Sequence, residues 1–130
     1  MGSYDDPTIL DEENLRACSR DLQGVDIAFC DFIQTPIEAE SFYYIDPPYH
    51  NTFSGYDGSG FGDAEHKKLA QFCGRLDKAG CYFMVSNSDT TLIRSLYKDF
   101  AIEEVMAARF VSCKANQRGR ESELVIRNYQ

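Results

Sequence analysis

The tetrapeptide Asp46-Pro47-Pro48-Tyr49, directly after the apolar run Phe42–Ile45, constrains the fold of this chain more than any other segment. The aromatic run predicts a short strand. Two consecutive prolines lack backbone N–H groups and fix φ, so the strand must end there. The tetrapeptide is therefore held at the carboxyl end of a strand, which is where open α/β sheets bind their ligands.

The groups at this strand end suit a planar base that carries an exocyclic amine. The carboxylate of Asp46 and the carbonyl of Pro47 are acceptors for the two N–H bonds of such an amine. The ring of Tyr49 can stack on the face of the base. The alternative is a strand end followed by a rigid turn, but we favour a binding role, because a buried Asp without a partner is costly.

Three further segments flank the tetrapeptide in a fixed order: Cys30-Asp31-Phe32, Ser86-Asn87-Ser88-Asp89-Thr90, and Arg118-Gly119-Arg120 followed by Glu123-Leu124-Val125-Ile126. With these flanks the chain, from about Glu12 to its C-terminus, resembles the Dam-type (D12 class) S-adenosylmethionine-dependent DNA adenine-N6 methyltransferases. The resemblance implies transfer of a methyl group from S-adenosylmethionine, without a metal, to the N6 amine of an adenine flipped out of double-stranded DNA.

The resemblance also implies a role for individual residues. The catalytic set at the flipped adenine consists of Asp46, Pro47, Pro48 and Tyr49. The cofactor-binding set consists of Asp31, Phe32 and Asp46, although Asp31 can equally begin a turn and Phe32 can belong to the core. The DNA-binding set consists of Lys114, Asn116, Arg118 and Arg120, for which a solvated charged turn is the alternative.

Alternation of helical and strand patterns predicts an α/β fold. Helices are expected at residues 12–22 after an Asp11 cap, at 63–78 capped by Asp63, and at 89–98 capped by Asp89. Strands are expected at residues 25–30, 42–45, 81–85, 102–110 and 122–128, the last two as an antiparallel hairpin. We expect His66 to lie in solvent. Neither His66 nor His50 is spaced as a metal ligand or catalytic base. The aromatic residues between Tyr49 and Gly62 either close over the base or pack on the sheet.

By resemblance, residues 1–130 are the single C-terminal part of a methyltransferase catalytic domain, with residues 1–10 disordered or derived from a tag. The expected fold is a partial Rossmann-like sandwich that lacks the first two strands and the target-recognition segment, since the family's Phe-x-Gly-x-Gly turn does not occur. In the family's sheet the two missing strands separate residues 25–30 from residues 42–45. The chain must close that gap, leave the first strand loose or recruit a partner. We also expect the chain alone to lack turnover.

Charge is distributed unevenly along the chain. The net charge is -8, but residues 1–65 hold 14 acidic and 2 basic residues, whereas residues 106–130 hold 2 acidic and 5 basic residues. Because phosphate binding requires Lys and Arg, DNA contact is expected only at the basic tail. The five cysteines include no C-x-x-C pair, which indicates reduced thiols in a cytoplasmic protein. No apolar run is long enough to predict a membrane span.

Two other functions remain open at this stage. One is methylation of another planar amine, in RNA or protein, against which Asp46 in place of Asn argues. The other is a non-catalytic remnant or interaction module that self-associates as a homodimer or pairs with a missing N-terminal half, because an exposed sheet edge favours association.

Overall fold

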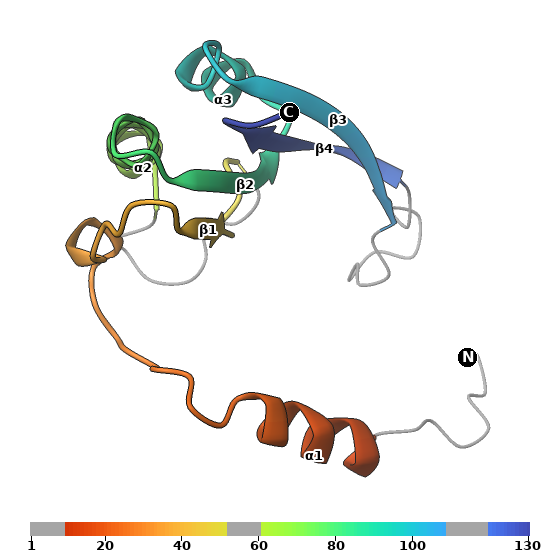
Figure 1. The fold of residues 1–130 in the computed structure, drawn as a ribbon. Helices are drawn as coiled ribbons and strands as arrows, with labels where there is room; N and C mark the ends of the chain where they lie inside the picture. Colours follow the sequence, from red (N-terminus) through yellow and green to blue (C-terminus); the bar gives the residue numbers. More distant parts are fainter. Residues whose placement is uncertain (1–9, 52–60, 109–119) are drawn as a thin grey trace, which may run out of the picture. The chain divides into compact units, whose positions relative to one another are not determined.

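The structure, a computed structural model, describes residues 10–51, 61–108 and 120–130. The chain divides into two compact units, residues 1–30 and residues 31–130, and each is described by itself (Figure 1).

The first unit contains helix α1 (Glu12–Asp21), as the sequence predicts. The carboxylate of Asp11 accepts a hydrogen bond from the backbone N–H of Asn14 at 3.0 Å and caps the helix. One helical turn later, Arg16 donates to Glu12 at 2.8 Å. The apolar side chains of Leu15 and Leu22 are more than half exposed. The helix therefore begins with local capping and ion pairing, and its apolar side is left uncovered.

The prediction of a buried strand at residues 25–30 is wrong. These residues form no strand, and Val25, Ile27 and Phe29 are 52%, 83% and 106% exposed. An extended segment becomes a stable strand only when a neighbour satisfies its backbone hydrogen bonds, and no described strand pairs with this segment.

The second unit is built on a mixed four-stranded sheet with the order β1-β2-β4-β3. Strand β1 (Phe42–Ile45) is parallel to β2 (Tyr82–Ser88), with Ile45 opposite Val85. Strand β4 (Arg120–Arg127) is antiparallel to both β2 and β3 (Ala101–Ala108). The predicted antiparallel pairing of the last two strands is thereby confirmed.

Two α-helices and a short 3-10 helix, η1 (Phe32–Gln34), complete this unit. Helix α2 (Asp63–Lys78) has the predicted bounds, although Gly62 rather than Asp63 occupies its N-cap. Helix α3 (Thr91–Leu96) is shorter than predicted, and Thr90 caps it instead of Asp89. The carboxylate of Asp89 is instead bound twice by Arg94, at 2.6 and 2.8 Å, which explains the wrong prediction.

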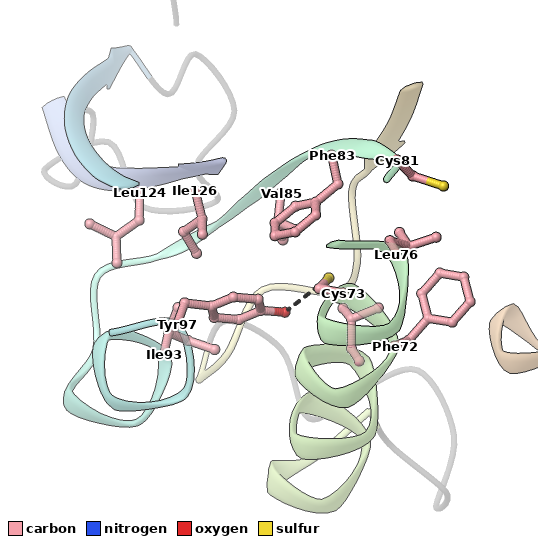
Figure 2. Packing of buried hydrophobic residues seen from close by; sticks show 11 residues of the cluster. Phe72, Cys73, Leu76, Cys81, Phe83, Val85, Ile93, Tyr97, Leu124 and Ile126 are labelled. Carbon is pink, nitrogen blue, oxygen red and sulfur yellow. Dashed lines mark hydrogen bonds between the residues drawn. The ribbon is translucent and has the colours of Figure 1, made fainter. Parts of the chain in front are cut away.

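The core lies between one face of the sheet and the two helices α2 and α3 (Figure 2). Along β2 every second side chain is buried, so Phe83 and Val85 face the helices together with Leu124 and Ile126 of β4. The ring of Phe83 meets that of Phe100 edge-on at 5.0 Å. The even-numbered residues of β2 therefore face away from this core, a division that places the site described below.

Two polar groups of the core contact each other across the helix pair. The thiol of Cys73 lies 3.9 Å from the hydroxyl of Tyr97, and both residues are almost completely buried (Figure 2). Burial raises the pKa of Cys73 to about 12, with the Tyr97 contact opposing the shift, and burial likewise raises the pKa of Tyr97. At neutral pH the thiol is therefore protonated and poorly nucleophilic.

Thiol labelling tests this packing. In the folded chain, a thiol reagent should modify the exposed Cys18 and Cys30 quickly and the buried Cys73 and Cys81 only after denaturation. Peptide mass spectrometry after timed labelling identifies the modified positions. Labelling of Cys73 as fast as Cys18 under native conditions would contradict the core described above.

Another polar side chain, His66 of α2, is 1% exposed, so its expected position in solvent is wrong. Its ring meets those of Phe61 and His50 edge-on at 4.9 and 5.3 Å. Within the described residues, neither ring nitrogen has a hydrogen-bond partner. Burial and the nearby His50 lower the pKa of His66, and Asp63 and Glu65 oppose this only in part.

This burial predicts a pH dependence of stability. The imidazole pKa is lower in the folded state than in the unfolded chain, where it is about 6.5. The unfolded state therefore binds more protons as pH falls through that value, so the free energy of unfolding should decrease between about pH 7.5 and pH 5.5. Urea unfolding at both pH values measures the decrease.

A His66→Leu variant is the comparison, because it places an apolar side chain that does not titrate at the buried position. The decrease in unfolding free energy between the two pH values should be smaller in the variant than in the natural chain. An equal decrease in both would show that His66 does not carry the effect.

Candidate active site

The tetrapeptide leaves β1 at its carboxyl end, and its first residue is not buried, contrary to the expectation from the sequence. Asp46 is exposed, and its Oδ1 accepts a hydrogen bond of 2.8 Å from the hydroxyl of Ser86 on β2. Ser86 lies on the face of β2 opposite to the buried Val85. A carboxylate that is bound through one oxygen keeps acceptor capacity for a ligand.

The last residue of the tetrapeptide is fixed from a more distant strand. The hydroxyl of Tyr49 donates to Oε2 of Glu123 on β4 at 3.2 Å. Partial burial raises the pKa of Tyr49, and the carboxylates of Glu123 and Asp46 add to the increase, whereas a hydrogen bond with Ser86 opposes it. At neutral pH the phenol is therefore protonated and the ring is uncharged.

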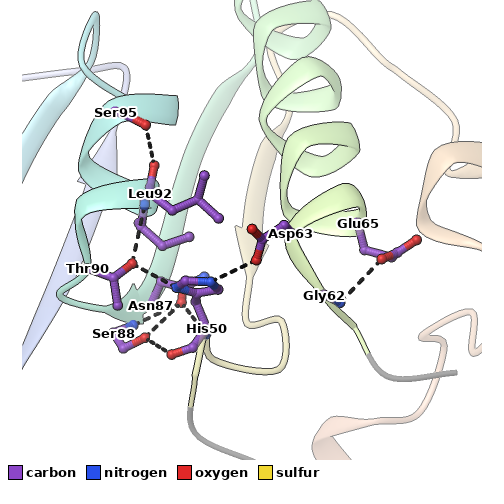
Figure 3. Close-up of polar contacts among 10 residues, drawn as sticks. His50, Gly62, Asp63, Glu65, Asn87, Ser88, Thr90, Leu92 and Ser95 are labelled. Carbon is purple, nitrogen blue, oxygen red and sulfur yellow. Dashed lines mark hydrogen bonds and ion pairs between the residues drawn. The ribbon is translucent and has the colours of Figure 1, made fainter. Parts of the chain in front are cut away.

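The backbone just after the tetrapeptide is bound to the end of β2 (Figure 3). The N–H of His50 donates to Oδ1 of Asn87 at 2.9 Å, and the hydroxyl of Ser88 donates to the carbonyl of His50. Asn87 is completely buried, so this contact connects the turn to the core. Both backbone polar groups of His50 are thereby satisfied by consecutive residues of one strand.

The ring of His50 extends the network to both α-helices (Figure 3). Its Nδ1 lies 2.9 Å from the hydroxyl of Thr90, and its Nε2 lies 3.0 Å from the carboxylate of Asp63. Because Thr90 already accepts from the N–H of Ile93, its own proton is available to Nδ1. In the tautomer with Nε2–H, the ring donates to Asp63 and accepts from Thr90, so His50 connects the beginnings of α2 and α3.

A pocket of about 360 Å³ opens beside the tetrapeptide. Side chains from η1, β1 and α2 line it together with the tetrapeptide's first three residues: Phe32, Thr35, Tyr43, Tyr44, Ile45, Asp46, Pro47, Pro48, Phe61, Leu69 and Phe72. The ring of Phe32 lies 6.1 Å from those of Phe61 and Phe72. An apolar, aromatic pocket with one carboxylate is typical of a site for a flat heterocycle.

The structure brings Phe32 and Asp46 together at this pocket, but Asp31 is not among its lining residues. Asp31 instead caps η1, where its carboxylate accepts from the N–H of Ile33 at 3.0 Å. This contact matches the alternative considered from the sequence, an Asp that begins a turn, and it leaves the second carboxylate oxygen outside the capping bond.

Most of the expected DNA-binding residues fall outside the part of the chain that the structure describes. Three of them, Lys114, Asn116 and Arg118, are outside the described residues. The fourth, Arg120, begins β4, and its backbone pairs with Ala108. Among the described residues, no three His, Cys, Asp or Glu side chains are grouped to hold a metal ion. The helices of residues 10–51, 61–108 and 120–130 include none with the length and hydrophobicity needed to cross a bilayer.

Sequence reasoning missed two residues of this site, His50 as an anchor and Glu123 as the partner of Tyr49. Glu123 is 74 residues from Tyr49 along the chain, so no local spacing connects them. The available signal was the alternation Glu123-Leu124-Val125-Ile126, which places a carboxylate on the face of β4 opposite to the core.

Comparison with known proteins identifies the family of this chain. Residues 1–110 match the family described as D12 class N6 adenine-specific DNA methyltransferase. The chain is 39% identical to "Type II methyltransferase M.MjaIII" of Methanocaldococcus jannaschii, over 98% of this chain and 47% of that protein. It is 34% identical to "Type II methyltransferase M1.LlaDCHI" of Lactococcus lactis subsp. cremoris, over 98% of this chain and 48% of that protein.

A third relative is the "Retron Ec67 DNA adenine methylase" of Escherichia coli, 32% identical over 95% of this chain and 44% of that protein. The chain thus spans about half the length of the curated relatives it matches. The family match covers the strand-end tetrapeptide, the pocket beside it and the residues of β2 that bind it. The chain belongs to the D12 class of N6 adenine-specific DNA methyltransferases.

Proposed function

We propose that this chain is the base-holding part of an enzyme that methylates the N6 amine of adenine in DNA. The observation that carries the proposal is the rigid turn Asp46-Pro47-Pro48-Tyr49, which presents two acceptors and a ring beside an aromatic pocket. Family membership supports the same reaction, and three relatives are named as methyltransferases or an adenine methylase.

In this proposal Asp46 and the carbonyl of Pro47 accept the two N–H bonds of the adenine amine. The two bonds would orient the nitrogen lone pair and stabilise the positive charge that develops on nitrogen as a new C–N bond forms. The bond from Ser86 supports this role, because it leaves the second oxygen of Asp46 for the amine. Asp46 would therefore act as an orienting and charge-stabilising acceptor.

Tyr49 would stack on the flipped adenine. The contact of its hydroxyl with Glu123 supports this role, because it holds the ring next to the strand end. A flipped base loses its stacking partners in the duplex, and an aromatic ring in the enzyme offsets part of that loss.

The pocket lined by Phe32 fits the adenine end of S-adenosylmethionine. Its aromatic rings can flank a heterocycle, and Asp46 supplies a carboxylate at its edge. S-adenosylmethionine, when bound, would supply an activated methyl group on a sulfonium. Phe32 and Phe72 would then exclude water from one side of the ligand, while Asp46 would lie between the ligand and the target amine.

The finer features of the enzyme extend the same proposal. We infer that the four-stranded sheet is part of a Rossmann-like methyltransferase sandwich, that double-stranded DNA is the substrate, and that Lys114, Asn116, Arg118 and Arg120 contact it. Since the chain spans about half of its relatives' length, we expect this chain alone to bind ligand weakly and to lack turnover.

A second candidate role, as an interaction module, is favoured by one observation. The side chains of Val25, Ile27 and Phe29 alternate along an extended segment and are all more than half exposed. Such a segment can pair with a strand of another polypeptide. This role is compatible with the enzymatic one, because a partner chain could supply the rest of the cofactor site.

Cofactor binding by the pocket is tested by titration of S-adenosylhomocysteine into the ¹⁵N-labelled chain, followed by NMR. Shifts should concentrate at Phe32, at Phe72 and around Asp46. Replacing the ring in Phe32→Ala should weaken binding on the order of tenfold, because the ring contributes on the order of 1–3 kcal/mol of stacking. Loss of Asp31 should matter less than loss of Phe32.

Asp99→Ala is the control for that titration, because Asp99 is an exposed carboxylate outside the pocket. Binding by the control should equal that of the natural chain. Absence of shifts at millimolar ligand, or equal weakening in the control, would contradict a cofactor pocket formed by this chain.

A further inference from the structure

Two side chains on neighbouring strands bind the polar groups of the tetrapeptide: Ser86 binds Asp46 and also the hydroxyl of Tyr49, and Glu123 binds Tyr49. Ser86 on β2 donates to Asp46 at 2.8 Å, and Glu123 on β4 accepts from Tyr49 at 3.2 Å. The register pairs Ser86 with Val125 and Ser88 with Glu123, so the two binding residues lie close together on adjacent strands. Both lie on the face of the sheet opposite to the buried core residues.

We propose that Ser86 and Glu123 are positioning residues that fix Asp46 and Tyr49 in the orientations needed to receive an adenine. The inference rests on the proposed function for its purpose, but the two contacts that define it belong to this chain. Neither residue touches the substrate in this proposal, and each acts through the residue that it binds.

The argument for Glu123 starts from the hydroxyl of Tyr49. Stacking needs only a ring, and a phenylalanine at this position would offer the same apolar face. The hydroxyl therefore has a separate purpose, which its contacts with Glu123 and Ser86 supply. With Cα at one end and the Oε2 of Glu123 at the other, the long axis of the ring is held at both ends before any base arrives.

The argument for Ser86 concerns the rotation of a carboxylate. The terminal torsion of an Asp side chain is broad, so an exposed carboxylate samples many orientations. The bond from Ser86 engages one of the two oxygens of Asp46 and so restricts the rotation of the carboxylate. A carboxylate set in advance in this way loses less freedom when it accepts an amine, which strengthens binding.

The position of β1 explains why such side-chain contacts are needed. In the described sheet β1 is an end strand, paired only with β2 through four residues. The backbone of the tetrapeptide therefore receives sheet hydrogen bonds from one side at most, and its prolines donate none. Side chains from β2 and β4 supply the orientation that a second neighbouring strand cannot.

The Tyr49 contact is tested by NMR of the chain with ¹³C-labelled tyrosine. Among the eight tyrosines, the Tyr49 signal is assigned by its absence in Tyr49→Phe. Glu123→Gln should shift this signal and lower the pKa of Tyr49, because it removes the carboxylate charge beside the phenol. Glu103→Ala, which removes an exposed carboxylate bound to Arg127 on the same sheet, should change neither.

The purpose of both contacts is tested with 9-ethyladenine as the probe for the base site. Glu123→Ala and Ser86→Ala should each weaken probe binding, up to about tenfold, relative to Glu103→Ala. In a Tyr49→Phe background, Glu123→Ala should weaken probe binding less than it does in the natural chain, because the hydroxyl that it contacts is already absent. Far-UV circular dichroism verifies that each variant is folded.

The outcomes separate the two proposals. If the natural chain does not bind 9-ethyladenine, the proposed base site fails in this chain, and the Tyr49 signal still decides whether Glu123 positions the ring. An unchanged Tyr49 signal and pKa in Glu123→Gln would overturn the positioning role of Glu123. Additive losses in Tyr49→Phe and Glu123→Ala would overturn it as well, and unchanged probe binding in Ser86→Ala would overturn that of Ser86.

Discussion

The hydrogen bond from the backbone of His50 to the buried amide of Asn87 connects the candidate site to the core. Asn87 belongs to β2, whose alternate residues Phe83 and Val85 form the centre of the apolar cluster. The alternate residues Met84 and Ser86 face the other side of the sheet. One strand therefore supplies the packing that stabilises the unit, the anchor for the turn and a contact to Asp46.

Patterns of period two and of helical period predicted much of this fold. The sequence indicated β1, β2, the closing antiparallel pair and the bounds of α2, because each has a regular apolar face or a clear end signal. It misjudged residues 25–30, since an alternating apolar segment becomes a strand only beside a neighbour. It also misjudged the cap of α3, because Asp89 forms an ion pair with Arg94 that no capping rule anticipates.

The candidate site was predictable where its chemistry is contiguous in sequence and not where it depends on the fold. The tetrapeptide and Phe32 were identified from local motifs, and the structure brings Phe32 and Asp46 to one pocket. The contacts of Ser86 with Asp46 and of Glu123 with Tyr49 join residues 40 and 74 positions apart. Such pairs follow from strand order and register, which a single sequence does not specify.

The end-strand position of β1 determines which substitutions can change the geometry of the turn. Because side chains of β2 and β4 bind the turn, substitutions at Ser86 or Glu123 would change the orientation of Asp46 and Tyr49. Such changes on the outward face of the sheet leave the core residues Leu124 and Ile126 in place, so the geometry of the turn can vary separately from the packing that stabilises the unit.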